Sequence, residues 1–288
     1  MSKYPQHRIS EISDIGIGFL QISSGQAIKV PVTYKHQDDY YMFGFVESGT
    51  CRLHVDFQDY ELKGGEAMFL LPGQVHAFDE QSQLNACVLL VDSVFVKEEI
   101  QQSLVKYMFS HRLPLVLDSV HGQELKLLYS MLANRMKNSG ESFSRYVKVD
   151  LALAIVHVFA EAASLGCHDG TVRDCYVAHT LHFLKLLDEN LAESHSPSYY
   201  ADKLCISPVY LNESVKATTG LSVSRMIQYE IVLRAKRMLA YTDCSVKEIA
   251  LELGFDDCSY FIKIFTKQTG ISPVQFRKNH KYSNTDHE

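Results

Sequence analysis

A set of polar and basic residues near the C-terminus could contact a polyanion from one face of a helix. Ser259, Lys263 and Lys267 are spaced four residues apart, so a helix would present all three on the same side. A lysine ammonium can donate to phosphate oxygens or to the acceptor atoms of guanine, and a serine hydroxyl can contact either. Cys258 and Ile262 are apolar neighbours on this face. These five residues form a candidate contact surface for double-stranded DNA, provided that the surrounding elements place them on a recognition helix.

The residues before this face predict a short helix and a tight turn. Ser245 and Glu248 have the S-x-x-E spacing of a capping box, in which the side chain of each bonds the backbone N–H of the other. Gly254 stands where that helix would end, in the left-handed conformation that glycine tolerates best. Asp256 and Asp257 can cap the next helix, whose positive end favours their charge.

The second helix carries an apolar stripe opposite its polar face. Phe261, Ile264 and Phe265 have i, i+3, i+4 spacing, which predicts that they pack inward. Two helices around a tight turn are typical of the helix-turn-helix motif, whose second helix enters the DNA major groove. One such motif is a weak indication, because many helical hairpins look alike.

The same pattern occurs a second time, upstream. Leu211 and Val215 stand 50 residues before Phe261 and Phe265, and T-G-L-S at 219–222 matches T-G-I-S at 269–272. Repetition at a fixed period marks a duplicated structural unit. The outward-facing residues of the first copy, which we also expect to contact DNA, are Val209, Asn212, Glu213 and Lys216.

A helical segment without Pro or Gly, residues 222–241, joins the two copies. About 18 helical residues span roughly 27 Å. Successive major grooves on one face of B-DNA lie about 34 Å apart. A linker of this length, together with the bodies it joins, is therefore expected to set two recognition helices into adjacent grooves.

Residues from about 178 to 280 resemble the DNA-binding domain of the AraC/XylS family of bacterial transcription regulators. The motifs that carry the resemblance are S-V-x-E-I-A at 245–250, L-G-F at 253–255, S-Y-F at 259–261, F at 265 and T-G-I-S-P-x-x-F-R at 269–277. The resemblance implies a sequence-specific regulator, in most cases an activator that recruits RNA polymerase, often under control of a small effector. It also implies helices in the N-terminal half that pair two subunits into a homodimer.

Three positions depart from the family pattern. The family often has Arg where Glu213 stands, an aromatic residue where Val215 stands, and usually Arg where Lys263 stands. A carboxylate can accept from cytosine N4 but is repelled by phosphate, so Asn212 is the favoured base contact of the first copy. Lys263 would act as a point charge rather than a bidentate fork, and with Ser259 it is the leading contact of the second copy.

Length and composition indicate two soluble domains. The chain has 288 residues, 46% of them hydrophobic and 22% charged. No apolar run approaches the ~18 residues that a membrane helix needs, and the N-terminus lacks the features of a signal peptide. Seven cysteines are scattered without a C-x-x-C pair, which is typical of reduced thiols. We therefore expect a cytoplasmic protein.

The charge of the chain is unevenly distributed. Residues 172–288 hold 14 Lys+Arg and 14 Asp+Glu, which leaves 14 and 20 of the totals of 28 and 34 in the first 171 residues and explains the net charge of −6. Only local basic clusters can therefore supply phosphate contacts. We expect them at Arg234, Lys236, Arg237, Lys263, Lys267, Arg277, Lys278 and Lys281.

The first 95 residues show the pattern of β-strands. Aromatic and aliphatic runs separated by turn residues occur at Tyr40–Glu47, Thr50–Phe57, Tyr60–Lys63, Ala67–Leu71 and Ala86–Val91. Short, evenly spaced strands predict a small barrel or jelly roll. Residues 64–76, GGEAMFLLPGQVH, resemble the second conserved segment of the cupin-like sensor domain found upstream of such DNA-binding domains.

The barrel interior is the default site for a small molecule. We expect its lining to include Tyr34, His36, Tyr40, Phe43, Phe45 and His76. No metal or other cofactor is expected, because cupin enzymes use H-x-H and a following Glu, whereas His36 and His54 stand alone. Three alternatives stay open: a metal-dependent cupin-type enzyme with a helical appendage, an adaptor that recruits polymerase without reading bases, and a repressor of the same family.

Helical periodicity begins at Val94. It predicts helices at Phe95–Phe109, Ser119–Lys137, Phe143–Leu165 and Val172–Leu191. The third is apolar enough to be either buried or paired across a subunit interface. We therefore expect an α+β chain of two domains: a cupin-like sensor and dimerisation domain at 1–166, a linker at 167–171, an all-α double helix-turn-helix domain at 172–282 and a tail at 283–288.

Overall fold

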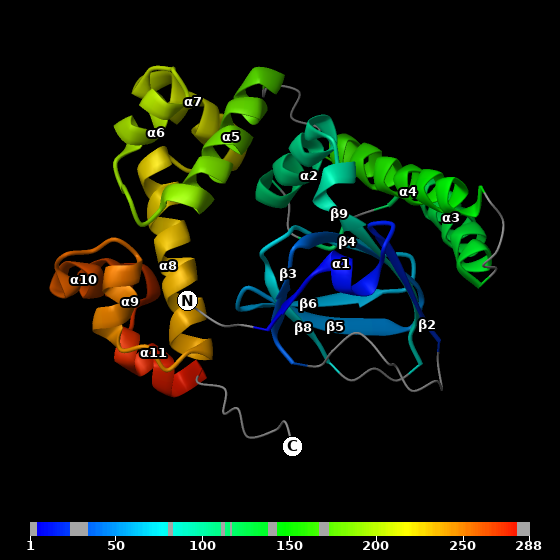
Figure 1. The fold of residues 1–288 in the computed structure, drawn as a ribbon, viewed down its shortest axis with the longest axis horizontal. Coiled ribbons are helices and arrows are strands. Elements are labelled where there is room, and N and C mark those ends of the chain that lie inside the picture. The colour runs from blue at the N-terminus through cyan, green and yellow to red at the C-terminus, as the bar shows by residue number, and fades with distance from the viewer. Residues whose placement is uncertain are drawn as a thin grey trace. The chain divides into compact units, whose positions relative to one another are not determined.

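The computed structural model of the chain contains two compact units, one spanning Pro5–Gly170 and one that contains Thr171–Glu288 (Figure 1). The structure describes residues 5–23, 34–79, 83–110, 113–115, 117–137, 143–166 and 173–280. The expected linker at 167–171 and the expected tail at 283–288 lie outside these residues. Each unit is described by itself.

The N-terminal unit contains two β-sheets that enclose an apolar interior. One sheet has the strand order β1-β3-β8-β5-β6 and the other β2-β9-β4-β7. Their bounds are β1 Gln6–His7, β2 Ile17–Ile22, β3 His36–Asp38, β4 Tyr40–Ser48, β5 Thr50–Val55, β6 Gln58–Lys63, β7 Ala67–Leu70, β8 Val75–Phe78 and β9 Asn85–Asp92. The five strands predicted from the sequence are present as β4, β5, β6, β7 and β9, whereas the sequence analysis misses β1, β2, β3 and β8.

The two sheets differ in what covers their outer faces, and their sequences differ accordingly. Along β5, buried Cys51, Leu53 and Val55 alternate with the more exposed residues between them, as expected for a strand with one face in water. Most of β4 is buried on both faces. The ring of Phe43 packs on Phe159, with ring centroids 5.1 Å apart, so a helix covers the outer face of this second sheet.

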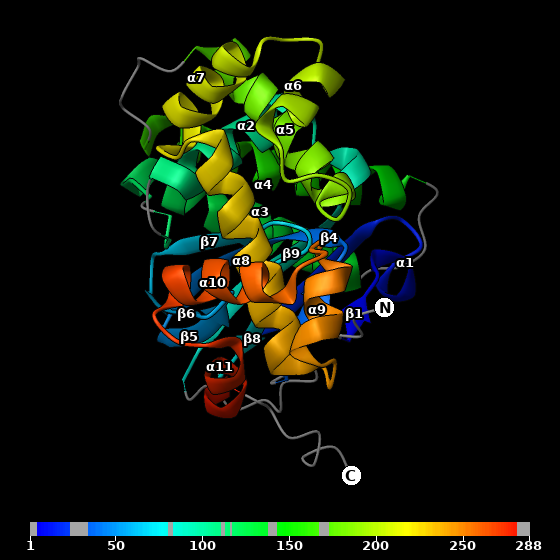
Figure 2. The ribbon, with the colours of Figure 1, turned by 90° about the vertical axis from the view of Figure 1, so that its left-hand side faces the viewer.

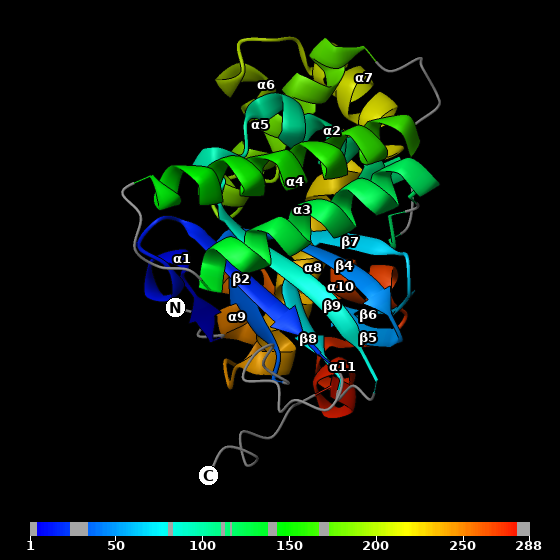
Figure 3. The same ribbon diagram turned by 90° about the vertical axis from the view of Figure 1, so that its right-hand side faces the viewer.

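The helices of this unit follow the strands. Figure 3 shows α3 (Ser119–Lys137) and α4 (Ser144–Gly166) lying together across the sheet of β2, β9, β4 and β7. The predicted helix at Phe95–Phe109 is a 3₁₀ turn, Ser93–Phe95, followed by α2 (Glu98–Ser110), because Val96 is extended and interrupts the helical backbone. A one-turn helix, α1 (Ile9–Ile12), precedes β2.

The packing of helix α4 within its unit accounts for its apolar sequence. By length and composition the helix could cross a membrane, with a mean hydropathy of 1.6, contrary to the expectation that no apolar run is long enough, and 33% of its most apolar window is buried. In the fold, however, it contacts α2, α3 and β2, and Ile155, Val156 and Phe159 are fully buried. The N-terminal end of α4 is less covered, since Tyr146 is 64% exposed.

The C-terminal unit is all α-helical. Its helices are α5 Asp174–Asn190, α6 Pro197–Lys203, α7 Pro208–Thr219, α8 Val223–Tyr241, α9 Val246–Glu252, α10 Cys258–Thr269 and α11 Pro273–His280. Helix α8 is the linker predicted from the sequence, and its 19 residues span roughly 28 Å. It runs between a group of helices containing α6 and α7 and another containing α9 and α10 (Figures 1 and 2).

The duplication predicted from the sequence is reproduced in hydrogen bonds. Thr219 Oγ1 donates to the carbonyl of Val215 at 2.8 Å, and Thr269 Oγ1 donates to that of Phe265 at the same distance. Each threonine oxygen then accepts from the backbone N–H two residues on, and the glycine between, Gly220 or Gly270, is left-handed in both copies. These repeated contacts are the signature of one structural unit used twice.

Candidate nucleic-acid interface and barrel interior

The start of the second helix-turn-helix is built as its sequence predicts. The Ser245 hydroxyl accepts from the backbone N–H of Glu248, and the Glu248 carboxylate accepts from that of Ser245, so the capping box is complete. Asp257 caps α10 by accepting from the N–H of Ser259 at 2.8 Å. Gly254 has φ +84°, the left-handed conformation that the turn requires.

The second recognition helix, α10, separates its faces cleanly. Phe261 and Phe265 are fully buried, whereas Ile264 is only half-buried. The residues predicted to contact DNA lie on the other side: Ser259, Ile262, Lys263 and Lys267 are exposed and Cys258 is half-buried. The outer face of α10 therefore offers hydroxyl and ammonium donors to an external partner.

The first recognition helix, α7, presents a different surface. Val209 is 69% exposed, and Glu213 and Lys216 are also exposed. Asn212 is half-buried, and its side-chain oxygen accepts from the backbone N–H of Val223 at 3.2 Å. That bond satisfies a free donor at the start of α8. The side-chain oxygen of Asn212 is thus engaged in a hydrogen bond within the protein.

Several basic residues of the predicted clusters have structural partners. Arg234 Nη2 lies 2.6 Å from Asp188 and its Nε lies 2.8 Å from Glu230. The guanidinium of Arg277 donates to the backbone carbonyls of Leu239 and Cys244, near the end of α8. These arginines tie helices together.

Lys236 is also turned toward the protein. Its ammonium lies 5.8 Å from the centre of the Phe276 ring, and burial lowers the pKa of Lys236. By contrast, Lys263 and Lys267 are exposed on α10. Lys281 lies outside the described residues.

A contact that the sequence analysis missed joins the two halves of the unit. His195, in the segment between α5 and α6, places its Nε2 2.8 Å from the carbonyl of Leu253 and its ring 4.5 Å from that of Phe255. A Cβ atom added to Gly254 would lie 2.3 Å from the carbonyl oxygen of Ala192. The first half therefore packs directly on the turn of the second, and no local sequence pattern indicates such a contact.

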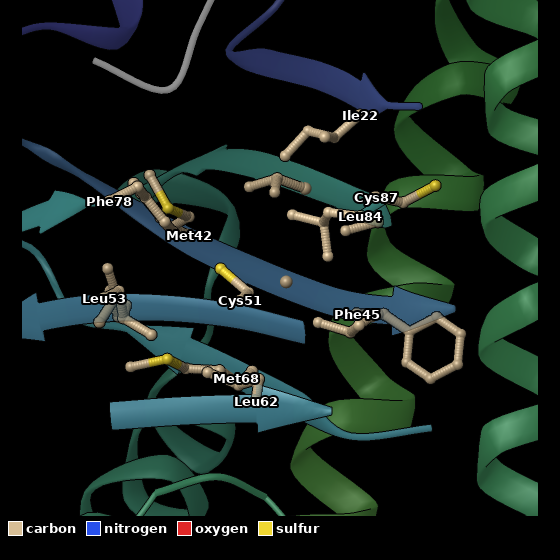
Figure 4. Close-up of a pocket in the computed structure, with 15 residues that line it drawn as sticks. Ile22, Met42, Phe45, Cys51, Leu53, Leu62, Met68, Phe78, Leu84 and Cys87 are labelled. Carbon is tan, nitrogen blue, oxygen red and sulfur yellow. The ribbon is translucent and has the colours of Figure 1, made fainter. Parts of the chain in front are cut away.

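The barrel encloses a small apolar cavity between its two sheets. Its volume is about 40 Å³, and its lining has no polar surface. Met42 and Met68 line it from one sheet, and Leu53 and Phe78 from the other (Figure 4). This volume is far below the roughly 300 Å³ at which pockets for drug-sized ligands begin.

The aromatic residues predicted to line the interior face elsewhere. Phe43 is fully buried against α4 and does not border the cavity. Phe45 borders it, but its ring extends toward the helices and lies 6.4 Å from that of Tyr129 (Figure 4). Because side chains alternate along a strand, the even-numbered residues of β4, such as Met42, face the cavity instead.

The remaining predicted residues, Tyr34, His36, Tyr40 and His76, gather in a polar cluster with His7 and Asp38. Asp38 Oδ1 lies 3.6 Å from His7 Nδ1 and 3.7 Å from His36 Nε2. Asp38 Oδ2 lies 3.3 Å from His76 Nε2. The sequence analysis expects His36 to stand alone. That expectation is wrong, because His7 and His76 reach it from neighbouring strands and Asp38 lies two residues further along β3.

Burial sets the charge of this cluster. It lowers the pKa of His36 to about 3 and that of His76 to about 4. It raises the pKa of Asp38 to about 7, although the Tyr40 hydroxyl acts in the opposite direction. Near neutral pH both imidazoles are thus uncharged, and each has one nitrogen available as an acceptor.

Comparisons with known proteins agree with both halves of this description. Residues 200–279 match the family model for a helix-turn-helix domain, and residues 30–151 match that for an AraC-like ligand binding domain. The HTH-type transcriptional activator RhaS of Escherichia fergusonii is 24% identical over 251 residues, which cover 85% of this chain and 87% of that protein. The arabinose operon regulatory protein of Escherichia coli K12 is 26% identical over 164 residues, covering 56% and 53%.

Among solved structures, ToxT of Vibrio cholerae O395 aligns over 93% of this chain and 98% of its own, with 14% identity and a TM-score of 0.42. The family models, rather than this likeness, carry the assignment. A ligand-binding-type barrel followed by two helix-turn-helix units is the domain order that both sequence and fold display. The chain therefore belongs to the AraC/XylS family of DNA-binding transcription regulators.

Proposed function

We propose that this regulator reads a specific DNA sequence, with α10 as its principal reader, and activates transcription from the promoter it binds. The observation that carries the proposal is the exposed face of α10, where Ser259 and Lys263 point outward beside fully buried Phe261 and Phe265. The AraC-type relatives named above include an activator, which supports the sign of regulation. RNA polymerase is the partner that this role requires.

The two recognition helices make unequal contributions in this proposal. On α10, Lys263 and Lys267 supply positive charge, Ser259 supplies a hydroxyl, and Cys258 and Ile262 supply apolar contacts. On α7, Val209 and Lys216 face outward, and the amide nitrogen of Asn212 is the remaining polar donor. We infer that α7 mainly positions the protein and that α10 provides most of the sequence discrimination.

Selection of bound sites from random DNA tests this proposal directly. A sequence-specific double reader should enrich one motif with two half-sites about one helical turn, roughly 10 base pairs, apart. An adaptor that does not read bases should enrich no motif. A protein that contacts phosphates should also lose affinity as salt rises, with a slope set by the number of phosphates neutralised.

A substitution at Glu213 tests how the first recognition helix, α7, contacts DNA. It stands at the position that Lys263 occupies in the second copy and is exposed on α7. Because a carboxylate near phosphates is repelled, Glu213→Ala should raise affinity for random DNA by about 3- to 10-fold at low salt, and less at high salt. Fluorescence anisotropy at two salt concentrations measures this. A loss of affinity confined to the selected site would instead assign Glu213 to a cytosine contact.

A small effector that enters the barrel must displace side chains. The cavity of about 40 Å³ admits only a very small guest, and its lining is apolar. We propose that effector binding opens this space by moving the methionine side chains, which adapt readily to irregular shapes. An apolar effector should raise the thermal stability of the protein and shift its affinity for DNA.

We also propose that the protein is a homodimer in the cytoplasm and has no catalytic role. Helix α3 exposes Leu127 (66%) and Met131 (54%), which lie one turn apart on a single face. Leu127→Glu should therefore shift the protein from dimer to monomer in sedimentation experiments. Val94→Glu, at a residue that is 78% exposed elsewhere in the unit, is the matched control and should leave the dimer intact.

A further inference from the structure

We propose that His7, His36, Asp38 and His76 bind a first-row divalent transition-metal ion, of which Zn²⁺ is the simplest probe. The inference does not depend on the regulatory function proposed above. It stands on the position of the four side chains, on the hydrogen bonds behind them, and on polar atoms that lack partners.

The sheet topology brings the four residues to one place. His36 of β3 is the cross-strand partner of His76 on β8, and His7 of β1 is the partner of Asp38 on β3. Asp38 follows His36 by two residues and so lies on the same face of the strand. On β8, His76 shares its face with Phe78, which lines the apolar cavity. The cluster therefore lies on the inner face of this sheet.

The distances suit a metal with nitrogen and oxygen ligands. Ligands about 2.0–2.2 Å from a tetrahedral metal are separated from one another by roughly 3.3–3.6 Å. The three histidine nitrogens lie 3.6, 3.7 and 3.3 Å from the nearer oxygen of Asp38. The candidate ligand atoms of His7, His36 and Asp38 all lie within 4.8 Å of one another. His76 lies outside that group of three but 3.3 Å from Asp38, so a rotation of its side chain would complete the site.

Hydrogen bonds behind the histidines hold the rings in a ligating orientation. His36 Nδ1 donates to the carbonyl of Tyr34 at 3.0 Å, and His76 Nδ1 donates to that of Gln74 at 3.1 Å. Each bond places the proton on Nδ1 and leaves the Nε2 lone pair directed at Asp38. His7 turns its Nδ1 to Asp38 and bonds the Tyr34 hydroxyl through Nε2 at 2.8 Å. Metal-bound histidines usually have such an outer partner.

The atoms that face the centre of the cluster lack partners. Among the described residues, both carboxylate oxygens of Asp38 and Nε2 of His76 are buried without a well-formed hydrogen bond, although the nearby Tyr40 hydroxyl partly offsets the rise in the pKa of Asp38. Burying a polar atom without a partner is unfavourable, and more so if the atom is charged. A divalent cation would satisfy all three atoms at once and keep Asp38 ionised. Without a cation, the carboxyl group must carry a proton or stay unpaired.

The ligand set indicates the class of metal. Three imidazoles and one carboxylate suit Zn²⁺, Mn²⁺ or Fe²⁺, whereas Mg²⁺ and Ca²⁺ prefer oxygen ligands alone. A second group on the same sheet provides a contrast. His54, on the outer side of β5, lies 3.1 Å from Asp79 and also contacts Asp59, but Asp59 is 81% exposed. Exposed carboxylates pair in water without a metal, so His54 is a matched control.

The test uses the full chain, stripped of metal with a chelator and titrated with Zn²⁺ against a chromogenic competitor. We expect one Zn²⁺ per chain, no competition from Mg²⁺, and a rise in the unfolding temperature when Zn²⁺ is added. Asp38→Asn has nearly the same shape and should weaken Zn²⁺ binding at least about 100-fold. Tyr34→Phe removes one outer hydrogen bond and should weaken it about 10- to 100-fold. His54→Ala should leave Zn²⁺ affinity unchanged.

Two results would overturn the proposal. One is the absence of a Zn²⁺ equivalent in the folded wild-type protein. The other is an Asp38→Asn variant that folds, as circular dichroism shows, and binds Zn²⁺ as tightly as the wild type. Either would mean that the cluster is a set of neutral side chains around a protonated Asp38. DNA titrations of the same samples measure the regulatory function separately. Either proposal can therefore be rejected without affecting the other.

Discussion

Replacing Gly254 with alanine should destabilise the C-terminal unit by more than about 3 kcal/mol. Two costs add at this position. The backbone has φ +84°, a left-handed conformation that costs an L-residue about 1–2 kcal/mol. The new Cβ would also lie 2.3 Å from the Ala192 carbonyl oxygen, and this obstacle is backbone rather than a flexible side chain. The segment between α5 and α6 would have to move, which would strain the contact between His195 and Leu253.

Gly270 is the matched control for this experiment. It ends α10 with φ +78°, but among the described residues no atom beyond its two chain neighbours lies within 4 Å of the position of an added Cβ. Gly270→Ala should therefore cost only the conformational part, about 1–2 kcal/mol. Urea unfolding of both variants measures the difference. Equal destabilisation by the two substitutions would show that the packing of the α5–α6 segment on the turn contributes nothing.

Replacing Lys263 with alanine should weaken binding to the selected DNA site by ~1–3 kcal/mol, a loss of about 5- to 150-fold. Lys263 is exposed on α10, and no described salt bridge uses it, whereas Arg234 and Arg277 are engaged within the protein. Affinity for random DNA should fall much less, because a base contact matters only where the right base is present. Fluorescence anisotropy on both kinds of DNA provides the comparison.

Lys267→Ala separates the two kinds of contact. We expect a similar loss on selected and random DNA and a salt slope that falls by about one, which is the behaviour of a phosphate contact. If Lys263→Ala behaves in the same way, then Lys263 also contacts only phosphate. Sequence discrimination by α10 would in that case have to come from Ser259 and its neighbours.

The helix-turn-helix half could be predicted from sequence because its determinants are local. The capping box of Ser245 and Glu248 involves residues three apart, and the buried pair Phe261 and Phe265 lies within one turn of a helix. Such patterns need no knowledge of the rest of the fold. The local patterns did not predict the backbone conformation of Cys205. It takes the left-handed position that Gly254 holds in the second copy, with φ +55°.

The polar cluster of the barrel could be predicted only in part: the sequence analysis groups Tyr34, His36, Tyr40 and His76 but misses His7 and Asp38, which strand pairing brings to them. Strands β1 and β3 have two and three residues, which is too short for an alternating pattern to appear. Asp38 meets His76 only because β3 and β8 are neighbours in the sheet. The roles of Arg234 and Arg277 were hidden for the same reason, since Asp188 and Leu239 lie on other helices. Spacing in sequence indicates an exposed cation but not the group that neutralises it.

The hydrogen bond between His195 and Leu253 joins the two halves of the C-terminal unit at a second point besides α8. Two connections restrict changes in the distance between the recognition helices, and therefore in the spacing of the half-sites that they can contact. Adding five base pairs between the half-sites turns one of them by roughly half a revolution to the opposite side of the duplex. The protein would then distinguish promoters by the spacing of their half-sites as well as by their base sequence. A small insertion would abolish binding to a site whose bases are all intact.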